Sequence, residues 1–220
     1  MVEQAAQSSR LRITEIFYSL QGETRSVGLA TVFVRLTGCP LRCQYCDTAY
    51  AFSGGEWQDL AEIRTQVAAY GADYVTVTGG EPLAQKACLE LLSQLCDDGY
   101  EVSLETSGAM DISRVDPRVV RVVDIKTPGS GEVSKNLYSN LDLLTARDQL
   151  KFVICDAVDY QWCLATMAEY QLQDKCEILF SPSHEQLEAR ELAEWILRDR
   201  LAVRLQIQLH KYLWGNRPGC

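Results

Sequence analysis

Three cysteines with short spacing, Cys39, Cys43 and Cys46, indicate a metal-binding loop. Thiolates so close in sequence can bind one metal centre, and soft sulfur favours zinc or an iron–sulfur cluster. A structural zinc takes four ligands, and an electron-carrying cluster takes four cysteines. A site with three cysteines therefore leaves one metal position open, and an open position indicates chemistry.

Several polar segments each follow a predicted strand. A Gly-Gly-Glu-Pro turn comes after residues 74–77, and its glycines permit close approach of a ligand to the backbone. Glu105, Lys126 and the segment 181–184 each follow a further predicted strand. Plainer alternatives are a polar turn at Glu105, a solvated lysine at position 126 and a helix cap at 181–184.

Short β-branched runs alternate with helical patterns along the chain. Strands are predicted at residues 30–36, 74–77, 101–104, 119–123, 150–154, 177–180 and 204–209, and helices near 60–70, 84–95, 158–170 and 185–199. These roughly six βα steps predict an α/β fold with a parallel sheet. A closed eight-stranded barrel needs about 250 residues, so 220 residues predict an incomplete, open parallel βα barrel in a single domain spanning 1–220. Functional groups should gather at the carboxyl ends of its strands.

Composition excludes several classes of protein. The net charge of −9 and the pI near 4.8 oppose nucleic-acid binding. No run of about 18 apolar residues is present, and the first residues do not resemble a signal peptide, so we expect an intracellular, cytoplasmic protein that does not enter membranes. Nine cysteines, an odd number, oppose a disulfide framework. Small buried hydrophobes are expected at the other six: Cys88, Cys96, Cys155, Cys163, Cys176 and Cys220.

The C-x3-C-x2-C run followed by the Gly-Gly-Glu-Pro loop resembles the radical S-adenosylmethionine (SAM) superfamily. The resemblance implies that Cys39, Cys43 and Cys46 hold a [4Fe–4S] cluster in a loop at about residues 37–52, with SAM on the fourth iron. It also implies SAM contacts by the Gly-Gly-Glu loop at Gly80 and by Glu105.

Further segments resemble the 7-carboxy-7-deazaguanine synthase family of the queuosine pathway. They are Glu-Ile-Phe-Tyr-Ser-Leu-Gln-Gly-Glu at 15–23, Arg35 in the strand before the cysteines, Cys-Asp-Thr at 46–48 and Gln-Leu-His-Lys-Tyr at 208–212. The resemblance runs from about residue 11 to 212. It implies a radical ring contraction of 6-carboxy-5,6,7,8-tetrahydropterin to 7-carboxy-7-deazaguanine, with loss of ammonia and with SAM regenerated.

The family resemblance also implies site residues and partners. Substrate contacts are expected at Leu20, Gln21, Gly22, Arg35 and Thr78, and a Mg²⁺ ligand at Thr48. SAM contacts are expected at Gly80, Glu105, Lys126, Thr127, Pro128, Ser181, Pro182, Ser183 and His184. The implied partners are the small pterin substrate, a flavodoxin- or ferredoxin-type reductant and a second copy of the chain in a homodimer. Two departures from the family are Thr24, where glycine is common, and a tail at 213–220, which we keep out of the site.

Two alternatives remain open at this stage. A radical SAM activating enzyme, which acts on a glycine of a partner protein, shares the small size and the cysteine spacing. The Leu-Gln-Gly-Glu segment with Arg35 opposes it, because these residues suit a small carboxylated substrate. A non-catalytic iron–sulfur or zinc protein would need a fourth protein ligand.

Overall fold

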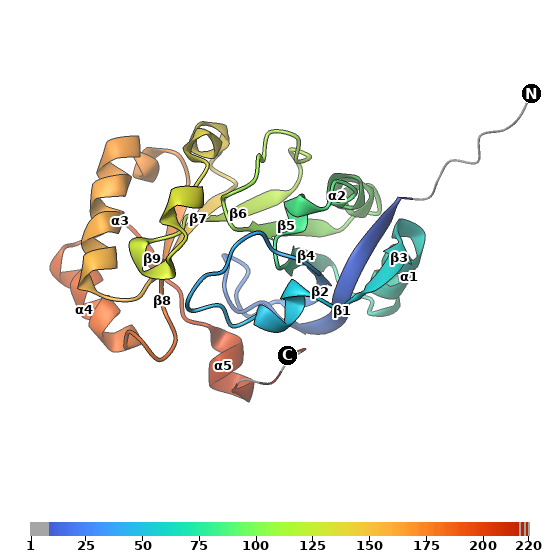
Figure 1. Ribbon diagram of the computed structural model, residues 1–220, viewed down its shortest axis with the longest axis horizontal. Coiled ribbons are helices and arrows are strands. Elements are labelled where there is room, and N and C mark those ends of the chain that lie inside the picture. The colour runs from blue at the N-terminus through green and yellow to red at the C-terminus, as the bar shows by residue number, and fades with distance from the viewer. Residues whose placement is uncertain (1–8, 216, 218, 220) are drawn as a thin grey trace, which may run out of the picture.

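A computed structural model describes residues 9–215, 217 and 219 of the chain. The described strands form a single sheet, and helices lie on its outside (Figure 1). The strands are β1 (Arg10–Leu20), β2 (Ala30–Leu36), β3 (Glu56–Asp59), β4 (Tyr74–Gly79), β5 (Glu101–Thr106), β6 (Val120–Asp124), β7 (Gln149–Ile154), β8 (Glu177–Pro182) and β9 (Arg204–Leu205). The α-helices are α1 (Leu60–Ala69), α2 (Cys88–Asp97), α3 (Ala157–Tyr170), α4 (Ala189–Arg198) and α5 (Leu209–Trp214).

The sheet has nine strands in the order β3-β1-β2-β4-β5-β6-β7-β8-β9. From β2 to β9 every neighbouring pair is parallel, whereas β1 is antiparallel to β2 and β3 is antiparallel to β1. Strands β3 and β9 are the two edges of this sheet. The predicted open parallel βα barrel is thus confirmed. The antiparallel strands β1 and β3 were not predicted.

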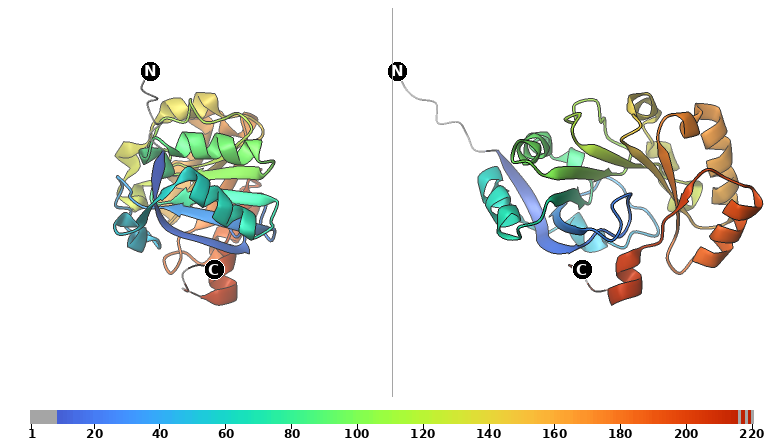
Figure 2. Two further views of the ribbon diagram at one scale, coloured as in Figure 1. Left: turned by 90° about the vertical axis from the view of Figure 1, so that its right-hand side faces the viewer. Right: turned by 180° about the vertical axis from the view of Figure 1, so that it is seen from behind.

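Helices α1 to α4 lie outside the curved sheet (Figure 2). Residues of the inner face line a cleft, which we call the lumen. Side chains alternate between the two faces, as the period of a strand requires. On β2, Val32 and Val34 join the core under the helices, whereas Phe33 and Arg35 line the lumen. Each Val or Leu buried in this core contributes about 1.5–3 kcal/mol. Burial of Val32 and Val34 under the helices therefore turns the alternate residues of β2 toward the lumen.

The gap between the first and last strands is bridged by side chains of the β1–β2 hairpin and the C-terminal segment. Arg25 Nε lies 3.0 Å from Glu177 Oε2 on β8. The side chain of Gln206 donates to the carbonyl of Gly22 at 2.9 Å. No strand pair closes the barrel in the part of the chain that the structure describes, so these contacts help to hold it together.

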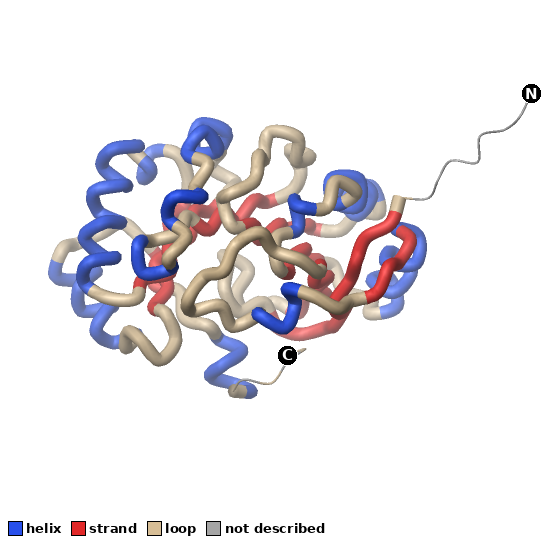
Figure 3. The backbone as a smooth tube through the Cα atoms, in the orientation of Figure 1, coloured by secondary structure: helices blue, strands red, loops and turns tan. Residues whose placement is uncertain are grey.

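Three predicted elements differ from the structure. The last strand ends at Leu205, because Gln206 turns away to reach Gly22. The fourth helix begins at Ala189, after Glu185 takes a left-handed φ of 64°. The helix predicted near 84–95 begins at Cys88, preceded by a 3₁₀ turn. No α-helix occurs between β5 and β6 or between β6 and β7, and Figure 3 shows loop in the first of these connections.

The buried ion pair between Arg121 and Asp148 is predicted to support the barrel. Asp148 is 1% exposed and accepts bonds from Arg121 and Thr145. Asp148→Ala should lower the free energy of unfolding in urea by about 3–5 kcal/mol, because Arg121 loses its counter-charge.

Asp142→Ala is the matched control, since the carboxylate of Asp142 is 82% exposed and its pair with Lys175 is solvated. It should change the free energy of unfolding by less than about 1 kcal/mol. Burial raises the pKa of Asp148, but the bonds from Arg121 and Thr145 outweigh it and lower the pKa below its usual value. The contribution of Asp148 is therefore present above about pH 4 and lost as the pH falls below it. Equal effects of the two variants would contradict this assignment.

Candidate active site

The lumen is a cleft of about 800 Å³ between the inner face of the sheet, the cysteine loop and the C-terminal segment. All the predicted site residues line it except Thr127 and Pro128. Thr127 is fully buried and its hydroxyl donates to the Val153 carbonyl and to Asp159. Its side chain therefore faces away from the cleft.

The cysteine loop is held mainly by contacts within residues 37–52 and by a bond to the segment that follows Lys126. Gly38 donates to the Ala51 carbonyl at 2.8 Å, and Gln44 donates to the Ser130 carbonyl at 3.0 Å. The guanidinium of Arg42 donates to the Cys39 carbonyl at 2.7 Å and lies 4.3 Å from the centre of the Phe52 ring. These contacts leave Cys39, Cys43 and Cys46 as free, half-buried thiols on the wall of the cleft.

The donor set fits a cluster with one open iron. Among the described residues, the three cysteines of the loop are the cysteines that line the cleft, and Cys88, Cys163 and Cys176 are buried elsewhere in the fold. Cys96 and Cys155 are half-buried and lie outside the cleft wall. Burial raises the pKa of the Cys43 thiol to about 11, so metal binding must displace a proton.

The Gly-Gly-Glu turn packs directly against the cysteine loop. A Cβ at Gly80 would lie 2.2 Å from the Gly38 carbonyl oxygen, and one at Gly79 would lie 2.3 Å from the Leu36 oxygen. The Gly79 φ of 140° also disfavours any side chain. Both glycines are therefore needed for this close packing, which places Gly80 beside Cys39.

Glu81 acts as a structural clamp behind the turn. Its carboxylate is fully buried and accepts bonds from the Thr106 hydroxyl, from the backbone and hydroxyl of Ser107 and from the Leu83 backbone. Four protein donors satisfy this charge, so it ties the end of β4 to the end of β5. The hydroxyls of Thr106 and Ser107 in the polar turn at 105–108 therefore serve to bind the Glu81 carboxylate.

A row of polar side chains crosses the inner face from β1 to β5. Glu15 pairs in register with Arg35, and Arg35 pairs with Thr78. The Thr78 hydroxyl donates to Glu105 at 2.9 Å, and the Gln21 amide donates to the same carboxylate at 3.2 Å. Burial and the nearby Glu23 carboxylate raise the pKa of Glu105. Glu105 thus lies among the residues predicted for substrate.

Gln21 serves mainly to hold this row together. It is 1% exposed, and its side chain also donates to Thr76 and accepts from the backbone of Glu23. Thr24 in the same hairpin is buried and has no positive φ, which explains why glycine is not required there. The hairpin therefore forms a rigid wall of the cleft.

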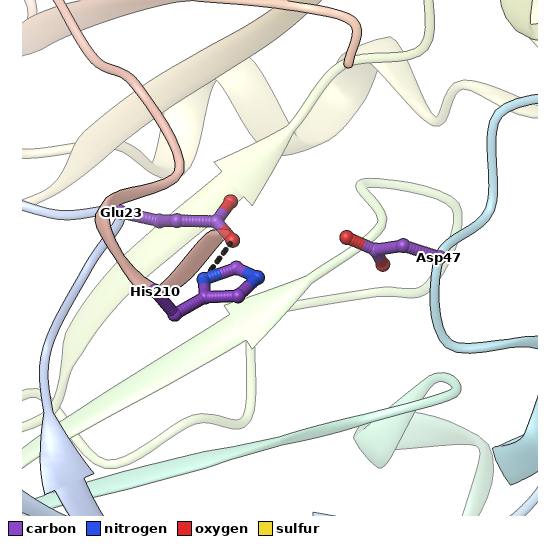
Figure 4. Close-up of side chains that lie close together, drawn as sticks. All are labelled: Glu23, Asp47 and His210. Carbon is purple, nitrogen blue, oxygen red and sulfur yellow. Dashed lines mark ion pairs between the residues drawn. The ribbon is translucent and has the colours of Figure 1, made fainter. Parts of the chain in front are cut away.

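A second polar group joins the hairpin, the cysteine loop and the C-terminal segment. Figure 4 shows Glu23 beside His210, with Asp47 facing them from the cysteine loop. The ligand atoms of these three residues lie within 4.8 Å of one another. Lys151 pairs with Glu23, and Lys211 lies 3.3 Å from Asp47. Both carboxylates therefore already have a cationic partner.

The hydroxyl of Thr48 and the carboxylate of Asp47 offer neighbouring oxygen atoms to a hard cation. Thr48 donates to Asp47 at 3.1 Å, and both residues line the cleft. Burial raises the pKa of Asp47, but Lys211 and the bond from Gln208 outweigh it and lower the pKa to about 2. An ionised carboxylate next to a hydroxyl fits Mg²⁺, which prefers oxygen ligands.

Further residues predicted for SAM lie at the carboxyl ends of β6 and β8. The ammonium of Lys126 pairs with Asp124 at 2.8 Å and lies 6.0 Å from the centre of the Tyr45 ring. Ser181 and Ser183 line the cleft, but their hydroxyls donate to the Gln206 carbonyl and to Gln186. His184 is half exposed at the rim, and the helix that follows it begins only at Ala189. The alternative of a helix cap at 181–184 is therefore wrong.

Sequence reasoning missed several charged residues of the cleft. Lys151 stands between apolar residues of β7, and this interruption was a usable signal. Asp124 directly follows the predicted strand 119–123, and Glu23 and His210 lie within the resembling motifs, but none of the three was assigned a role. Of the tail, which we expected to lie outside the site, Gly215, Arg217 and Gly219 line the cleft, and positions 216, 218 and 220 lie outside the described residues.

Comparisons with known proteins agree with this geometry. Residues 33–123 match the radical SAM superfamily. The chain is 48% identical to the 7-carboxy-7-deazaguanine synthase of Chlorobaculum tepidum, over 93% of this chain and 94% of that protein. It is 40% identical to the synthase of the same name from Koribacter versatilis, over 93% and 97%. The crystal structure of QueE from Escherichia coli has the same fold, with a TM-score of 0.75 at 24% identity over 90% and 94% of the two chains.

The three loop cysteines are predicted to hold iron, and the others are not. After anaerobic reconstitution with iron and sulfide, Cys39→Ala, Cys43→Ala and Cys46→Ala should each lose most of the bound iron, because three thiolates are the minimum for this centre. Cys96→Ala, on α2 outside the cleft, is the control and should retain the iron content of the parent. Iron analysis and visible absorption measure both. Iron loss in the Cys96 variant would reveal a fourth protein ligand and refute the open site.

Proposed function

The chain belongs to the 7-carboxy-7-deazaguanine synthase family, and on that premise we infer that it converts 6-carboxy-5,6,7,8-tetrahydropterin to 7-carboxy-7-deazaguanine with loss of ammonia. It is a radical SAM lyase of queuosine biosynthesis whose cofactors are a [4Fe–4S] cluster, SAM and Mg²⁺. When bound, the cluster and SAM supply the electron and the organic radical that removes a hydrogen atom from the pterin. Binding, orientation and exclusion of water fall to the chain's own residues.

The polar row across the inner face carries the assignment of the substrate subsite. Arg35 offers its terminal nitrogens to the substrate carboxylate, because a planar guanidinium binds a carboxylate through two parallel hydrogen bonds. Thr78 and Glu105 lie next along the same face. We assign Glu105 to the N–H groups of the pterin ring and not to the ribose of SAM, because its contacts are Gln21 and Thr78. Leu20, Gln21 and Gly22 form the wall beside it.

The cofactor subsites occupy the side of the cleft nearer the cysteine loop. Cys39, Cys43 and Cys46 ligate the cluster, and Gly80 presents backbone to SAM beside Cys39. Lys126 and the rim at 181–184 complete the SAM subsite. Thr127 and Pro128 contribute by shaping the backbone behind Lys126, since the Thr127 hydroxyl is engaged elsewhere. Thr48, with Asp47, would hold Mg²⁺, which would supply a Lewis acid for the substrate.

Partners and compartment follow the same assignment. The half-buried cysteines lie at a surface that a flavodoxin- or ferredoxin-type reductant can approach. Exposed apolar side chains on the first hairpin and α5, including Tyr18, Leu29 and Trp214, support a homodimer.

Free thiols suit the reducing cytoplasm. No described helix has the length and apolar character needed to cross a membrane. One continuous sheet supports a single domain over 1–220.

An anaerobic assay tests the function directly. Reconstituted, reduced protein with SAM and Mg²⁺ should convert the pterin to 7-carboxy-7-deazaguanine and ammonia, with product in molar excess over the SAM supplied. Mass spectrometry measures both products. A reaction without the pterin is the control. Slow SAM cleavage with the pterin left intact would contradict the assignment and direct attention to a protein substrate.

Glu105→Gln separates the two possible roles of that carboxylate. The variant should raise the KM for the pterin by about tenfold or more, because a charge-assisted hydrogen bond is lost, and leave the SAM dissociation constant unchanged. Steady-state kinetics and equilibrium binding of SAM measure the two effects. Weakened SAM binding with an unchanged pterin KM would return Glu105 to the SAM subsite.

A further inference from the structure

We propose that Glu15 is a positioning residue for substrate recognition, which fixes the guanidinium of Arg35 so that its terminal nitrogens meet a ligand carboxylate. The inference rests on the proposed function, because it assumes that Arg35 binds the substrate's carboxylate. Glu15 itself is not among the residues that line the cleft. It would act on the substrate only through Arg35.

The contacts of Glu15 hold one edge of the guanidinium. Arg35 Nε donates to Glu15 Oε1 at 2.7 Å, and the hydroxyl of Tyr50 donates to the same oxygen at 2.8 Å. The guanidinium carbon lies 5.5 Å from the centre of the Phe17 ring and 5.9 Å from that of Tyr50. One edge and the faces of the group are therefore restrained by protein.

The opposite edge of the guanidinium remains available. A guanidinium has five N–H donors, of which Nε carries one. Among the described residues, Glu15 is the acceptor found for Arg35, and it takes the Nε proton. The terminal nitrogens carry the other four, and one proton from each lies on the edge that binds a carboxylate through two parallel bonds. Arg35 lines the cleft, so this edge is accessible to a ligand there.

The backbone of β1 provides an independent argument. Leu11 and Ile13 lie in the core on the helical side of the sheet. Strict alternation would place residue 15 on that side as well. The pairing of β1 with β2 shifts register between Ile13 and Glu15, and beyond the shift Phe17 lines the cleft. Such bulges re-aim side chains and are typical near active sites. Here the shift turns a carboxylate inward, opposite Arg35.

The test uses two unreactive ligands that differ by one carboxylate. Calorimetric titration of 6-carboxypterin and of unsubstituted pterin into SAM-loaded, cluster-reconstituted protein gives a carboxylate preference for each variant. Glu15→Ala should raise the dissociation constant of 6-carboxypterin by about tenfold or more, because Arg35 loses its fixed orientation. The dissociation constant of unsubstituted pterin should stay unchanged. Glu15→Gln should stay within about threefold of the parent, because its amide oxygen still accepts from Nε. Tyr50→Phe, which removes one hydroxyl at a half-exposed position, should give a smaller loss of the same kind.

Asp98→Ala is the matched control, since it removes a partly buried carboxylate that pairs with Arg64 outside the cleft. It should leave the carboxylate preference unchanged. An undiminished preference in Glu15→Ala would overturn the proposal. So would equal weakening of both ligands, or a loss in Glu15→Gln as large as in the alanine variant. A parent protein without any carboxylate preference would instead refute the assigned substrate subsite, and the role of Glu15 with it.

Discussion

Pairing of charges inside the lumen is the constraint on which the rest of the structure depends. A charged side chain that is partly buried on the inner face needs a partner of opposite charge or hydrogen-bond donors, as Glu105 has in Gln21 and Thr78. Glu15 pairs with Arg35, Glu23 with Lys151 and Asp124 with Lys126. These pairs fix the positions of the charges before any ligand arrives. A preorganised set of charges costs little reorganisation when an anionic substrate binds.

Glu23, a member of one of these pairs, also takes part in closing the open barrel. No strand pair closes the gap among the described residues, and the first hairpin meets the C-terminal segment through bonds from Gln206 and Leu209 to the Gly22 carbonyl. Gln208 donates to Glu23 at 3.1 Å and to Asp47 at 2.8 Å, so one amide links the hairpin to the cysteine loop. The elements that close the barrel are thereby the elements that hold the cluster loop.

The sequence predicted the parallel strands, the open barrel and the wall of the cleft, because β-branched runs and short motifs are local signals. It did not predict β1 and β3, which lie in a hairpin and at an edge and lack a continuous apolar run. It also could not predict that Glu81 is a clamp or that the Thr127 hydroxyl points away, since both depend on partners 25 residues or more distant. The inward turn of Glu15 arises from a register shift that no residue pattern encodes.

We infer that the substrate lies along the polar row of β1 to β5, with its carboxylate at Arg35 and its ring at Glu105. The decisive measurement is an anaerobic crystal structure of the protein with cluster, SAM, Mg²⁺ and the carboxylated pterin. We expect two parallel hydrogen bonds from the terminal nitrogens of Arg35 to the carboxylate, with Thr78 and Glu105 at the ring. A carboxylate bound instead to Lys126 or Lys151, with Arg35 left to Glu15 alone, would contradict it.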